Sequence, residues 1–246
     1  MIISSLKNQH IVDLYKLHNK KERDAQGLFL VENWKIIKEG IDRNLITEIL
    51  TTDTDFHLEN SNIKITYITQ SILEKLSSTK TPQNIIAVCK KTQFSESKMK
   101  RVVVLDQIQD PGNLGTIMRN AVAFGFDTIV IQGVDVYNEK TVRSSQGALF
   151  YLNILQTNNL EDFFKKHQQN YQIIGTIIDK NSKEITEIKT KNTEIMVVFG
   201  NEGNGISDHL KQYFSQNVYI KINFESLNVA AASAIILNHL KEIKNA

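Results

Sequence analysis

The second half of the chain holds polar residues whose types and surroundings could support chemistry. Glu202 stands in the glycine-rich loop GNEGNG, where a carboxylate can accept hydrogen bonds from backbone N–H groups or bind a cationic ligand. Ser226 and Asn228 come just before an apolar segment, so they could cap a helix or contact a ligand there. Each of the three residues also has a purely structural interpretation, as a loop or cap residue.

Asn113 and Arg119 lie upstream, in a segment with helical periodicity. Asn113 is predicted to cap a helix that runs to Phe124, and Gly125 is suited to end it. The apolar stripe of this helix consists of Leu114, Ile117, Met118, Ala121 and Val122. Asn113, Arg119 and Asn120 fall outside the stripe. A solvent-facing arginine is ordinary on a helix, so Arg119 indicates a functional site only together with the other polar residues.

Short apolar runs must position these residues. Val102–Leu105, Thr128–Ile131 and Ile195–Phe199 are typical of buried parallel strands, and Val218–Ile222 is a further strand candidate. Open α/β sheets bind ligands in the loops at the carboxyl ends of their strands. The glycine loop after Ile195–Phe199 is therefore a candidate site, although a tight turn that binds nothing explains its glycines equally well.

The other elements expected in this half are a loop and helix over Val136–Phe150, a helix over Leu160–His167, a strand over Ile173–Ile178, a helix or loop over Ile185–Lys191 and a helix over Val229–Leu240. Arg143 and Ser145 offer guanidinium and hydroxyl donors suited to phosphate contacts. The small residues at the start of the last helix would let it pack closely, within the chain or across a dimer.

Several chemistries lack their signatures. The chain has no G-x-x-x-x-G-K-[ST] phosphate loop, no G-x-G-x-x-G dinucleotide fingerprint and no G-x-S-x-G nucleophile elbow. No group of histidines, cysteines or carboxylates has metal-ligand spacing, so no metal is expected.

The composition is ordinary for a soluble globular protein. Among 246 residues, 41% are hydrophobic and 23% charged, and the net charge of +2 neither indicates nor excludes a polyanionic partner. Cys89 is the one cysteine, and its apolar surroundings indicate a core residue rather than a nucleophile. No stretch is long enough to span a bilayer, and the N-terminal MIISSLKNQH lacks a secretory signal. We therefore expect a cytoplasmic protein without a membrane contact.

The first 90 or so residues alternate between strand and helix patterns, which predicts a small α/β unit. The expected helices are Asn8–Leu17, Trp34–Gly40 and Ser71–Leu76, and the expected strands are Leu28–Val31, Ile46–Thr51, Ile63–Ile68 and Ile85–Cys89. The polar segment Lys90–Arg101 marks a boundary, so we expect domains at residues 1–95 and 96–246. Its excess of basic residues suits either a solvated linker or an edge that touches a phosphate backbone.

Three segments together resemble a known family. DQIQDPGNLGTIMRNAVAFG, VVFGNEGNGIS and IKINFESLNVAAASAIIL are similar, in order and spacing, to the three motifs of the SpoU (TrmH-like) RNA 2′-O-ribose methyltransferases of the SPOUT superfamily. The resemblance covers roughly residues 102–242. YNEKTVRSSQGALF adds a fourth match, and RDAQGLFLVENWKIIKEGI looks like the start of the family's ribosomal-protein-like substrate-binding domain.

The resemblance implies a fold and a cofactor. The C-terminal domain would be a parallel sheet with a deep trefoil knot that holds S-adenosylmethionine, and the protein would be a homodimer with its site near the subunit interface. By motif position, the cofactor contacts would be Gly200, Ile220 and Leu227. The chain departs from the usual motifs at Lys221, where a proline is common, and at Ile222 and Asn33.

The implied reaction is methylation of a ribose 2′-hydroxyl in RNA. Arg119 matches the family's motif-one arginine; because a guanidinium does not readily give up its proton, we favour it as an electrostatic partner of the 2′-oxygen or a phosphate. Asn113, Glu202, Ser226 and Asn228 would orient Arg119, the ribose and the cofactor.

The appended N-terminal domain favours ribosomal RNA over transfer RNA as the partner. Lys21, Arg23, Arg143 and Ser145 are the candidate RNA contacts. A binding protein without catalysis and a small-molecule methyltransferase remain alternatives. The target nucleotide, the proton acceptor and the biological role are left open.

Overall fold

Short hydrophobic runs form two separate β-sheets in the computed structural model, which describes residues 2–59, 62–188 and 194–241. The chain divides into two compact units. The first unit contains residues 1–92 and 137–150, and the second contains residues 93–136 and 151–246. The chain therefore leaves the second unit after residue 136, contributes a segment to the first, and returns at residue 151.

The second unit is built on a seven-stranded sheet with the strand order β10-β12-β9-β11-β6-β7-β8. Every neighbouring pair in it is parallel. Its strands are β6 (Arg101–Ile108), β7 (Thr128–Gly133), β8 (Asn153–Gln156), β9 (Gln172–Thr176), β10 (Lys183–Glu184), β11 (Ile195–Phe199) and β12 (Gln216–Tyr219). The predicted α/β fold with a parallel sheet is confirmed.

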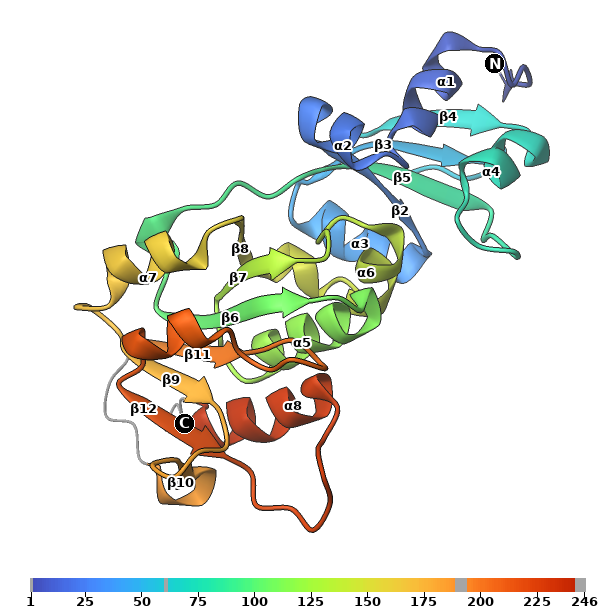
Figure 1. The fold of residues 1–246 in the computed structure, drawn as a ribbon. Helices are drawn as coiled ribbons and strands as arrows, with labels where there is room; N and C mark the ends of the chain where they lie inside the picture. Colours follow the sequence, from blue (N-terminus) through green and yellow to red (C-terminus); the bar gives the residue numbers. More distant parts are fainter. Residues whose placement is uncertain (1, 60–61, 189–193, 242–246) are drawn as a thin grey trace. The chain divides into compact units, whose positions relative to one another are not determined.

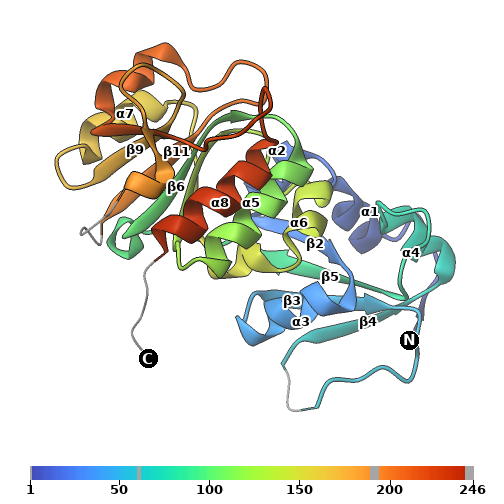
Figure 2. The same ribbon diagram turned by 90° about the horizontal axis from the view of Figure 1, so that it is seen from below.

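Helices cover both faces of this sheet. Helices α5 (Pro111–Ala123) and α8 (Val229–Leu240) lie side by side on one face, as Figures 1 and 2 show. Helix α7 (Leu160–His167) and the 3₁₀ helix η4 (Asp208–Tyr213) cover the other. The short 3₁₀ helices η1 (Glu96–Lys98) and η3 (Ile185–Glu187) lie at connections. Because both faces are covered, β11 has all five residues buried, which explains its continuous apolar sequence.

The order of the strands explains where a site can form. From β6 the chain moves outward through β7 and β8, and then crosses to the other side of the sheet, where β11 pairs with β6. The loops that follow β6 and β11 therefore begin side by side at one edge of the sheet and lead away in different directions. Such a reversal is where open α/β sheets form ligand crevices.

The first unit has a mixed five-stranded sheet with the order β1-β4-β3-β5-β2. Its strands are β1 (Ile2–Ile3), β2 (Leu28–Glu32), β3 (Ile46–Thr51), β4 (Lys64–Ile68) and β5 (Ile85–Lys90). Its helices are α1 (Gln9–Lys16), α2 (Lys20–Gln26), α3 (Trp34–Asp42), α4 (Gln70–Leu76) and α6 (Glu139–Ser145), and most of the 3₁₀ helix η2 (Ala148–Tyr151) belongs to it as well.

The segment 137–150 completes the core of the first unit. Successive strand residues face opposite sides, so Leu30 points to the cluster under α1 and α4, whereas Phe29 points to the other face. There the Phe29 ring lies 4.8 Å from the Tyr137 ring and 6.3 Å from the Phe150 ring, measured between centroids. Tyr137 and Phe150 are each 5% exposed. The boundary predicted between residues 95 and 96 therefore leaves residues 137–150 outside the unit whose core they complete.

Most predicted elements are confirmed, some to the residue, as for β3, α7, β11 and α8. Helix α2 was not predicted because its sequence, KKERDAQ, has no apolar stripe; Asn19 caps its start and Gly27, with φ of +65°, ends it. Strand β8 was also missed. Part of the segment expected at Ile185–Lys191 lies outside the described residues. Cys89 is fully buried, as expected, and burial raises the pKa of its thiol.

We predict that a fragment of residues 1–95 is much less stable than the same unit in the full chain. The fragment loses the burial of Tyr137, Val142 and Phe150, and each such side chain stabilises a fold by about 1.5–3 kcal/mol. That total is comparable to the whole stability of a small domain. Urea unfolding followed by circular dichroism, with and without an added peptide of residues 137–150, measures the effect.

A peptide in which both aromatic residues are replaced by alanine is the matched control and should not restore the fragment. An isolated fragment that unfolds cooperatively at the midpoint of the first unit in the full chain would contradict the prediction.

Candidate active site at the carboxyl edge of the second sheet

A chain of hydrogen bonds joins the three segments that carry the predicted polar residues. The Asn228 side-chain amide donates to Oδ1 of Asn113 over 3.0 Å, and the Asn113 amide donates to Oε1 of Glu202 over 2.9 Å. Asn113 lies in the first turn of α5, Glu202 in the loop after β11, and Asn228 at the start of α8. Three residues far apart in the sequence are thus held in one network.

The loop after β11 has a shape that only glycine permits at its first position. A Cβ atom on Gly200 would lie 2.2 Å from the carbonyl carbon of Gly205, because the loop folds back on itself there. Asn201 and Gly205 exchange two backbone hydrogen bonds, of 2.9 and 3.0 Å. The Asn201 amide also donates to the Gln107 carbonyl oxygen over 2.8 Å, which fastens this loop to the end of β6.

Glu202 is held from several sides. The backbone N–H groups of Gln109 and Asp110 each donate to its carboxylate over 3.4 Å, in addition to the Asn113 amide. Burial raises the pKa of the Glu202 carboxyl, but these hydrogen bonds more than offset it, so the pKa lies below its ordinary value. Glu202 is therefore an ionised, hydrogen-bonded carboxylate at neutral pH, which suits a positioning group better than a general base.

The predicted cap of α5 was wrong by one turn. Asp110 is the N-cap: its side chain accepts the Asn113 N–H over 2.8 Å, and Pro111 occupies the first helical position. The run D-P-G-N contains two residues that can cap a helix, and the proline selects the earlier one. This arrangement leaves the Asn113 side chain available for the network with Glu202 and Asn228.

Helix α8 begins at Asn228 and packs on α5. The Asn228 side-chain oxygen accepts the backbone N–H groups of Ala230 and Ala231 over 2.9 and 3.3 Å, so its predicted capping role is confirmed. Asn120 donates to the Ala230 carbonyl over 3.0 Å and to the Ser233 hydroxyl over 2.9 Å. The sequence marked Asn120 as polar and outside the apolar stripe, but gave no reason to assign it to the contact between these helices.

Arg119 is exposed on α5, next to Asn120 in the sequence. Within the described ranges its guanidinium makes no hydrogen bond or ion pair. The network of Asn113, Glu202 and Asn228 does not include Arg119, and Arg119 does not line the cavity beside α8 described below. An exposed guanidinium without an ion-pair partner in the described residues is available for an anionic ligand.

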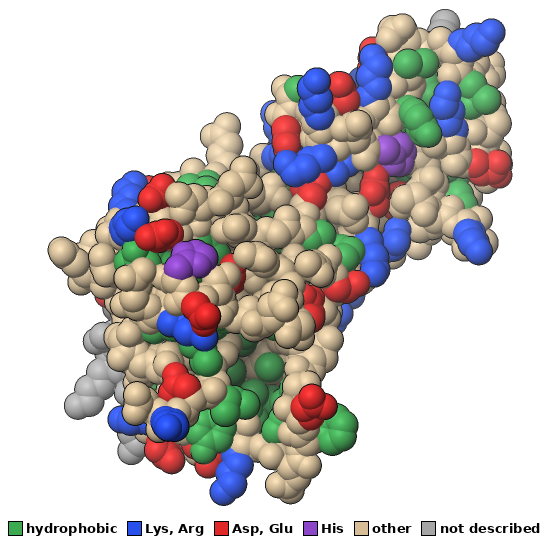
Figure 3. Space-filling view, in the orientation of Figure 1, with side chains coloured by type: hydrophobic (Ala, Val, Ile, Leu, Met, Phe, Trp, Pro, Cys, Tyr) green, Lys and Arg blue, Asp and Glu red, His purple; other side chains and the backbone are tan. Residues whose placement is uncertain are grey.

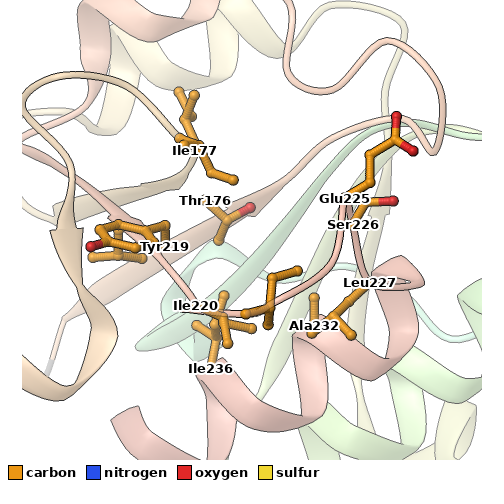
Figure 4. Close-up of a pocket in the computed structure, with 12 residues that line it drawn as sticks. Thr176, Ile177, Tyr219, Ile220, Glu225, Ser226, Leu227, Ala232 and Ile236 are labelled. Atoms are coloured by element: carbon orange, nitrogen blue, oxygen red, sulfur yellow. The ribbon is translucent and has the colours of Figure 1, made fainter.

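A cavity of about 190 Å³ lies beside α8, and Figure 4 shows the residues that line it. Ile220 and Leu227, two of the three predicted cofactor contacts, belong to its wall together with Ser226. Gly200, the third, shapes the preceding loop and is not among the lining residues. The other walls are mainly aliphatic: Ile177, Ile178, Val218, Ile222, Ala232 and Ile236.

Hydrophobic side chains around this cavity are open to solvent. Ile178 is 75% exposed, Phe224 81% and Leu227 39%. In Figure 3, hydrophobic side chains border a hollow next to the loop of residues 220–228. Exposed apolar surface around a cavity is typical of a ligand site or an interface.

Two predicted RNA contacts have structural roles instead. Arg23 is 3% exposed, and its guanidinium donates to the Leu17 and His18 carbonyl oxygens over 2.8 Å each. Ser145 is fully buried and donates to the Val142 carbonyl oxygen over 2.7 Å. Side chains already engaged in the core cannot reach a phosphate, so both residues are removed from the predicted set.

Lys21 and Arg143 keep accessible charges. Lys21 is exposed, and Arg143 is half-buried and donates to the Ser78 hydroxyl over 3.0 Å. In the polar segment before the second sheet, Arg101 is 6% exposed, and its guanidinium donates to the Leu240 carbonyl oxygen. Arg101 therefore fastens the start of β6 to the end of α8 and does not belong to a basic RNA-binding edge.

Two structural features are absent from the described part of the chain. It has no group of three or more histidine, cysteine or carboxylate side chains placed to hold a metal ion. Nor does any helix there combine the length and the apolar character needed to cross a membrane.

The geometry defines an α/β protein with a candidate site, built around a hydrogen-bonded carboxylate, at a strand-order reversal. Comparison with known families then identifies the class. The SpoU rRNA methylase family matches residues 100–238, and an MRM3-like substrate binding domain matches residues 8–87. Because the first match spans more than half of the chain, the chain belongs to the SpoU rRNA methylase family.

One curated relative and two solved structures are similar over nearly the whole length. The 23S rRNA (guanosine(2553)-2′-O)-methyltransferase RlmP of Bacillus subtilis is 34% identical, with 97% of this chain and 98% of that protein covered. An rRNA methyltransferase from Sinorhizobium meliloti is 25% identical, with a TM-score of 0.85 and 97% and 96% coverage. Its AdoMet-bound form has a TM-score of 0.84 at 24% identity, with the same coverage.

We predict a pH-dependent stability difference between the wild type and Glu202→Gln. The pKa of Glu202 is lowered on folding, so its charge stabilises the fold above the unfolded-state pKa of about 4.3. This contribution is lost as the pH falls through the lower folded-state pKa. Urea midpoints should therefore differ by a constant amount between pH 5.5 and 8, and the difference should shrink below about pH 4.

Glu225→Gln is the matched control, because Glu225 is exposed in a loop of the same unit and has no hydrogen bond within the described residues. An equal pH response of the two variants would contradict the assigned role of Glu202.

Proposed function

We propose that this protein transfers a methyl group from S-adenosylmethionine to a ribose 2′-hydroxyl of ribosomal RNA, with transfer RNA as the less favoured substrate. The observation that carries the proposal is the hydrogen-bonded chain Asn228–Asn113–Glu202, which brings the three family motifs together beside the Ile220–Leu227 cavity. The relative from Bacillus subtilis is a 2′-O-methyltransferase of 23S rRNA, which supports the same reaction here.

The cavity fits part of S-adenosylmethionine. Its aliphatic walls, including Ile220 and Ile236, suit the face of a purine ring, and Thr176 and Ser226 supply hydroxyl groups at its wall. Pockets that enclose a drug-sized ligand usually hold about 300–1,000 Å³. A cavity of about 190 Å³ therefore encloses only a portion of the cofactor, and the rest would lie along the open 220–228 loop. When bound, the cofactor supplies a methyl group on a positively charged sulfur.

Arg119 stabilises negative charge in this proposal. A ribose 2′-oxygen becomes a better nucleophile as its proton leaves, and an adjacent guanidinium favours the oxygen while it carries charge. The same planar group can hold the neighbouring phosphate with two hydrogen bonds. Asn113, Glu202 and Asn228 fix the loops around the reacting groups, and the exposed Ser226 hydroxyl orients the ribose or the cofactor.

The second unit forms a deep trefoil knot in this proposal. Its support is the way in which separate loops are fastened to one another. Asn201 donates to Gln107 at the end of β6, and the Ser207 N–H donates to the buried Asp106 carboxylate over 2.7 Å. The Asn228 amide donates to Asn113. These contacts suit a chain whose last segments are threaded close to the first strand of the sheet.

A homodimer is the proposed assembly. Ala231 and Ile235 are four residues apart, so they share a face of α8, and both are exposed. Arg119 lies outside the cavity lining, which suits a site completed by a second copy of the chain.

Residues 1–95 are proposed as the RNA-binding domain and residues 96–246 as the catalytic domain. Lys21 and Arg143 are the proposed RNA contacts that remain from the sequence. We also propose that the enzyme requires no metal and acts in the cytoplasm.

The first test measures cofactor binding by calorimetry and methyl transfer to in vitro transcribed 23S rRNA. We expect micromolar S-adenosylmethionine binding, at least tenfold weaker in Leu227→Asp because a carboxylate replaces an aliphatic wall. Arg119→Lys should bind the cofactor normally and lose at least tenfold in turnover, because a lysine cannot make the planar two-pronged contact.

Leu6→Asp is the matched control: Leu6 is 41% exposed and lies in the other unit, whereas Leu227 is 39% exposed. Failure of the folded wild type to bind S-adenosylmethionine would sink the enzymatic proposal. Cofactor-independent RNA binding would then make a binding protein the better account. Near-normal turnover of Arg119→Lys would remove only the role given to Arg119.

The dimer is tested by sedimentation velocity of the wild type and of Ile235→Asp. A carboxylate on the exposed face of α8 should weaken dimerisation at least tenfold, because a charge would be buried without a partner. Ile2→Asp, at an exposed isoleucine of the first unit, should leave the dimer intact. A wild type that sediments as a monomer at micromolar concentration would refute the assembly.

A further inference from the structure

A second, shallower cleft lies at the same edge of the sheet, where β6 and β7 end. It has a volume of about 420 Å³ and is lined by Gln107, Ile108, Gln109, Gln132, Gly133 and Val134. Three of the six lining residues are glutamines, and none carries a charge. The proposed reaction has not used any of them.

Gln107 has a backbone conformation that side chains rarely adopt. Its φ is +55°, and the pairing of β6 with β7 shifts register between Asp106 and Ile108, on either side of it. Glycine would occupy this conformation without strain. A bulge of this kind re-aims a side chain, and such strain concentrates at functional sites.

The floor of the cleft is tightly built. A Cβ atom on Gly133 would lie 2.4 Å from the Ile108 carbonyl oxygen, so the two strands approach each other closely at this point. The Val134 N–H donates to the same oxygen over 2.9 Å. The glutamines are therefore presented from a rigid base and not from a loose loop.

The cleft is fastened to the proposed active site. The Gln107 carbonyl oxygen accepts a hydrogen bond from Asn201, and the Gln109 N–H donates to the Glu202 carboxylate. The backbone of residues 107–109 thus lines the cleft and also contacts the loop that contains Glu202. A ligand in the cleft would lie beside the groups that position the ribose.

The chemistry of the lining selects a neutral ligand with hydrogen-bonding edges. A phosphate site would be expected to contain Lys or Arg, whereas this lining has only amide and aliphatic side chains. Within the described residues, the side-chain amides of Gln109 and Gln132 make no hydrogen bond, and the Gln107 amide makes one long contact of 3.5 Å with the Ser207 hydroxyl. Each amide can donate and accept at once, which matches the edge of a nucleobase.

We propose that Gln107, Gln109 and Gln132 read the hydrogen-bonding edge of an unpaired RNA base at or next to the methylated nucleotide. The inference rests on the proposed function and adds base selection to it. Sequence-specific RNA recognition generally targets unpaired bases through such edges, while the aliphatic floor can contact the face of the base.

The test uses full-length protein and in vitro transcribed 23S rRNA. The wild type is first used to map the 2′-O-methylated nucleotide, and four transcripts are then made that carry each base at that position. We expect the wild type to prefer one base by at least about tenfold. Gln107→Gly, Gln109→Ala and Gln132→Ala should each bring the four rates within about threefold of one another, with unchanged S-adenosylmethionine binding.

Gln107→Gly separates recognition from folding, because it relieves the positive φ and should melt at the same or a higher temperature. Gln169→Ala is the matched control, at an exposed glutamine just before β9 and so at the opposite edge of the sheet. An unchanged base preference in all three cleft variants would overturn the inference.

Filter binding of the same transcript distinguishes this inference from the proposed function. If the wild type transfers no methyl group, the enzymatic proposal fails. The role of the cleft is then tested by the RNA affinities of the wild type and the variants. A loss of at least tenfold in affinity in the cleft variants, with Gln169→Ala unaffected, would then support base recognition. Equal affinity in all variants would refute it.

Discussion

The ionised carboxylate of Glu202 is the group on which the rest of the site depends. It accepts hydrogen bonds from the start of α5 and from the backbone after β6, and through Asn113 it is linked to the start of α8. A neutral residue in its place could not attract so many donors at once. The charge of this one carboxylate therefore holds three chain segments together: the backbone after β6, the start of α5 and, through Asn113, the start of α8.

Hydrogen bonds to side chains explain why the loop after β11 can have an irregular backbone and still a defined shape. The loop that begins at Gly200 gains no stability from regular secondary structure. Its backbone groups are satisfied instead by the Asn201 side chain and by the bridge to Gly205. Polar side chains that replace regular pairing in this way supply partners for backbone groups at the edge of a sheet, as Asn201 does for the N–H groups of Gly203 and Asn204.

The sequence predicted the second sheet well because its strands are buried on both faces, and continuous apolar runs such as Ile195–Phe199 have few other interpretations. Motif order singled out Asn113, Glu202 and Asn228, and the structure joins these three residues in one hydrogen-bonded network. The sequence did not predict which of them touch, because the Asn113–Glu202 hydrogen bond depends on how β6 and β11 are placed side by side. Periodicity along the chain contains no information on that pairing.

Arg23 and Ser145 were predicted as RNA contacts, but the structure shows both of them buried. Both are polar residues near other polar residues, and a linear pattern cannot distinguish an exposed donor from one that is used inside the fold. Helix α2 escaped prediction for a related reason: caps at Asn19 and Gly27 define it, and Arg23 turns its charge inward. Burial of a charged side chain against carbonyl oxygens is a tertiary event.

The excursion of residues 137–150 into the first unit has a consequence for how the protein is made. A ribosome delivers the chain from its N-terminus, and Phe29 emerges more than one hundred residues before Phe150, against which it packs. Phe29 of the first unit therefore lacks its partners Tyr137 and Phe150 while β6, α5 and β7 are synthesised. The first unit therefore cannot be completed before residues 137–150, which lie between β7 and β8 of the second unit in the sequence, have been synthesised.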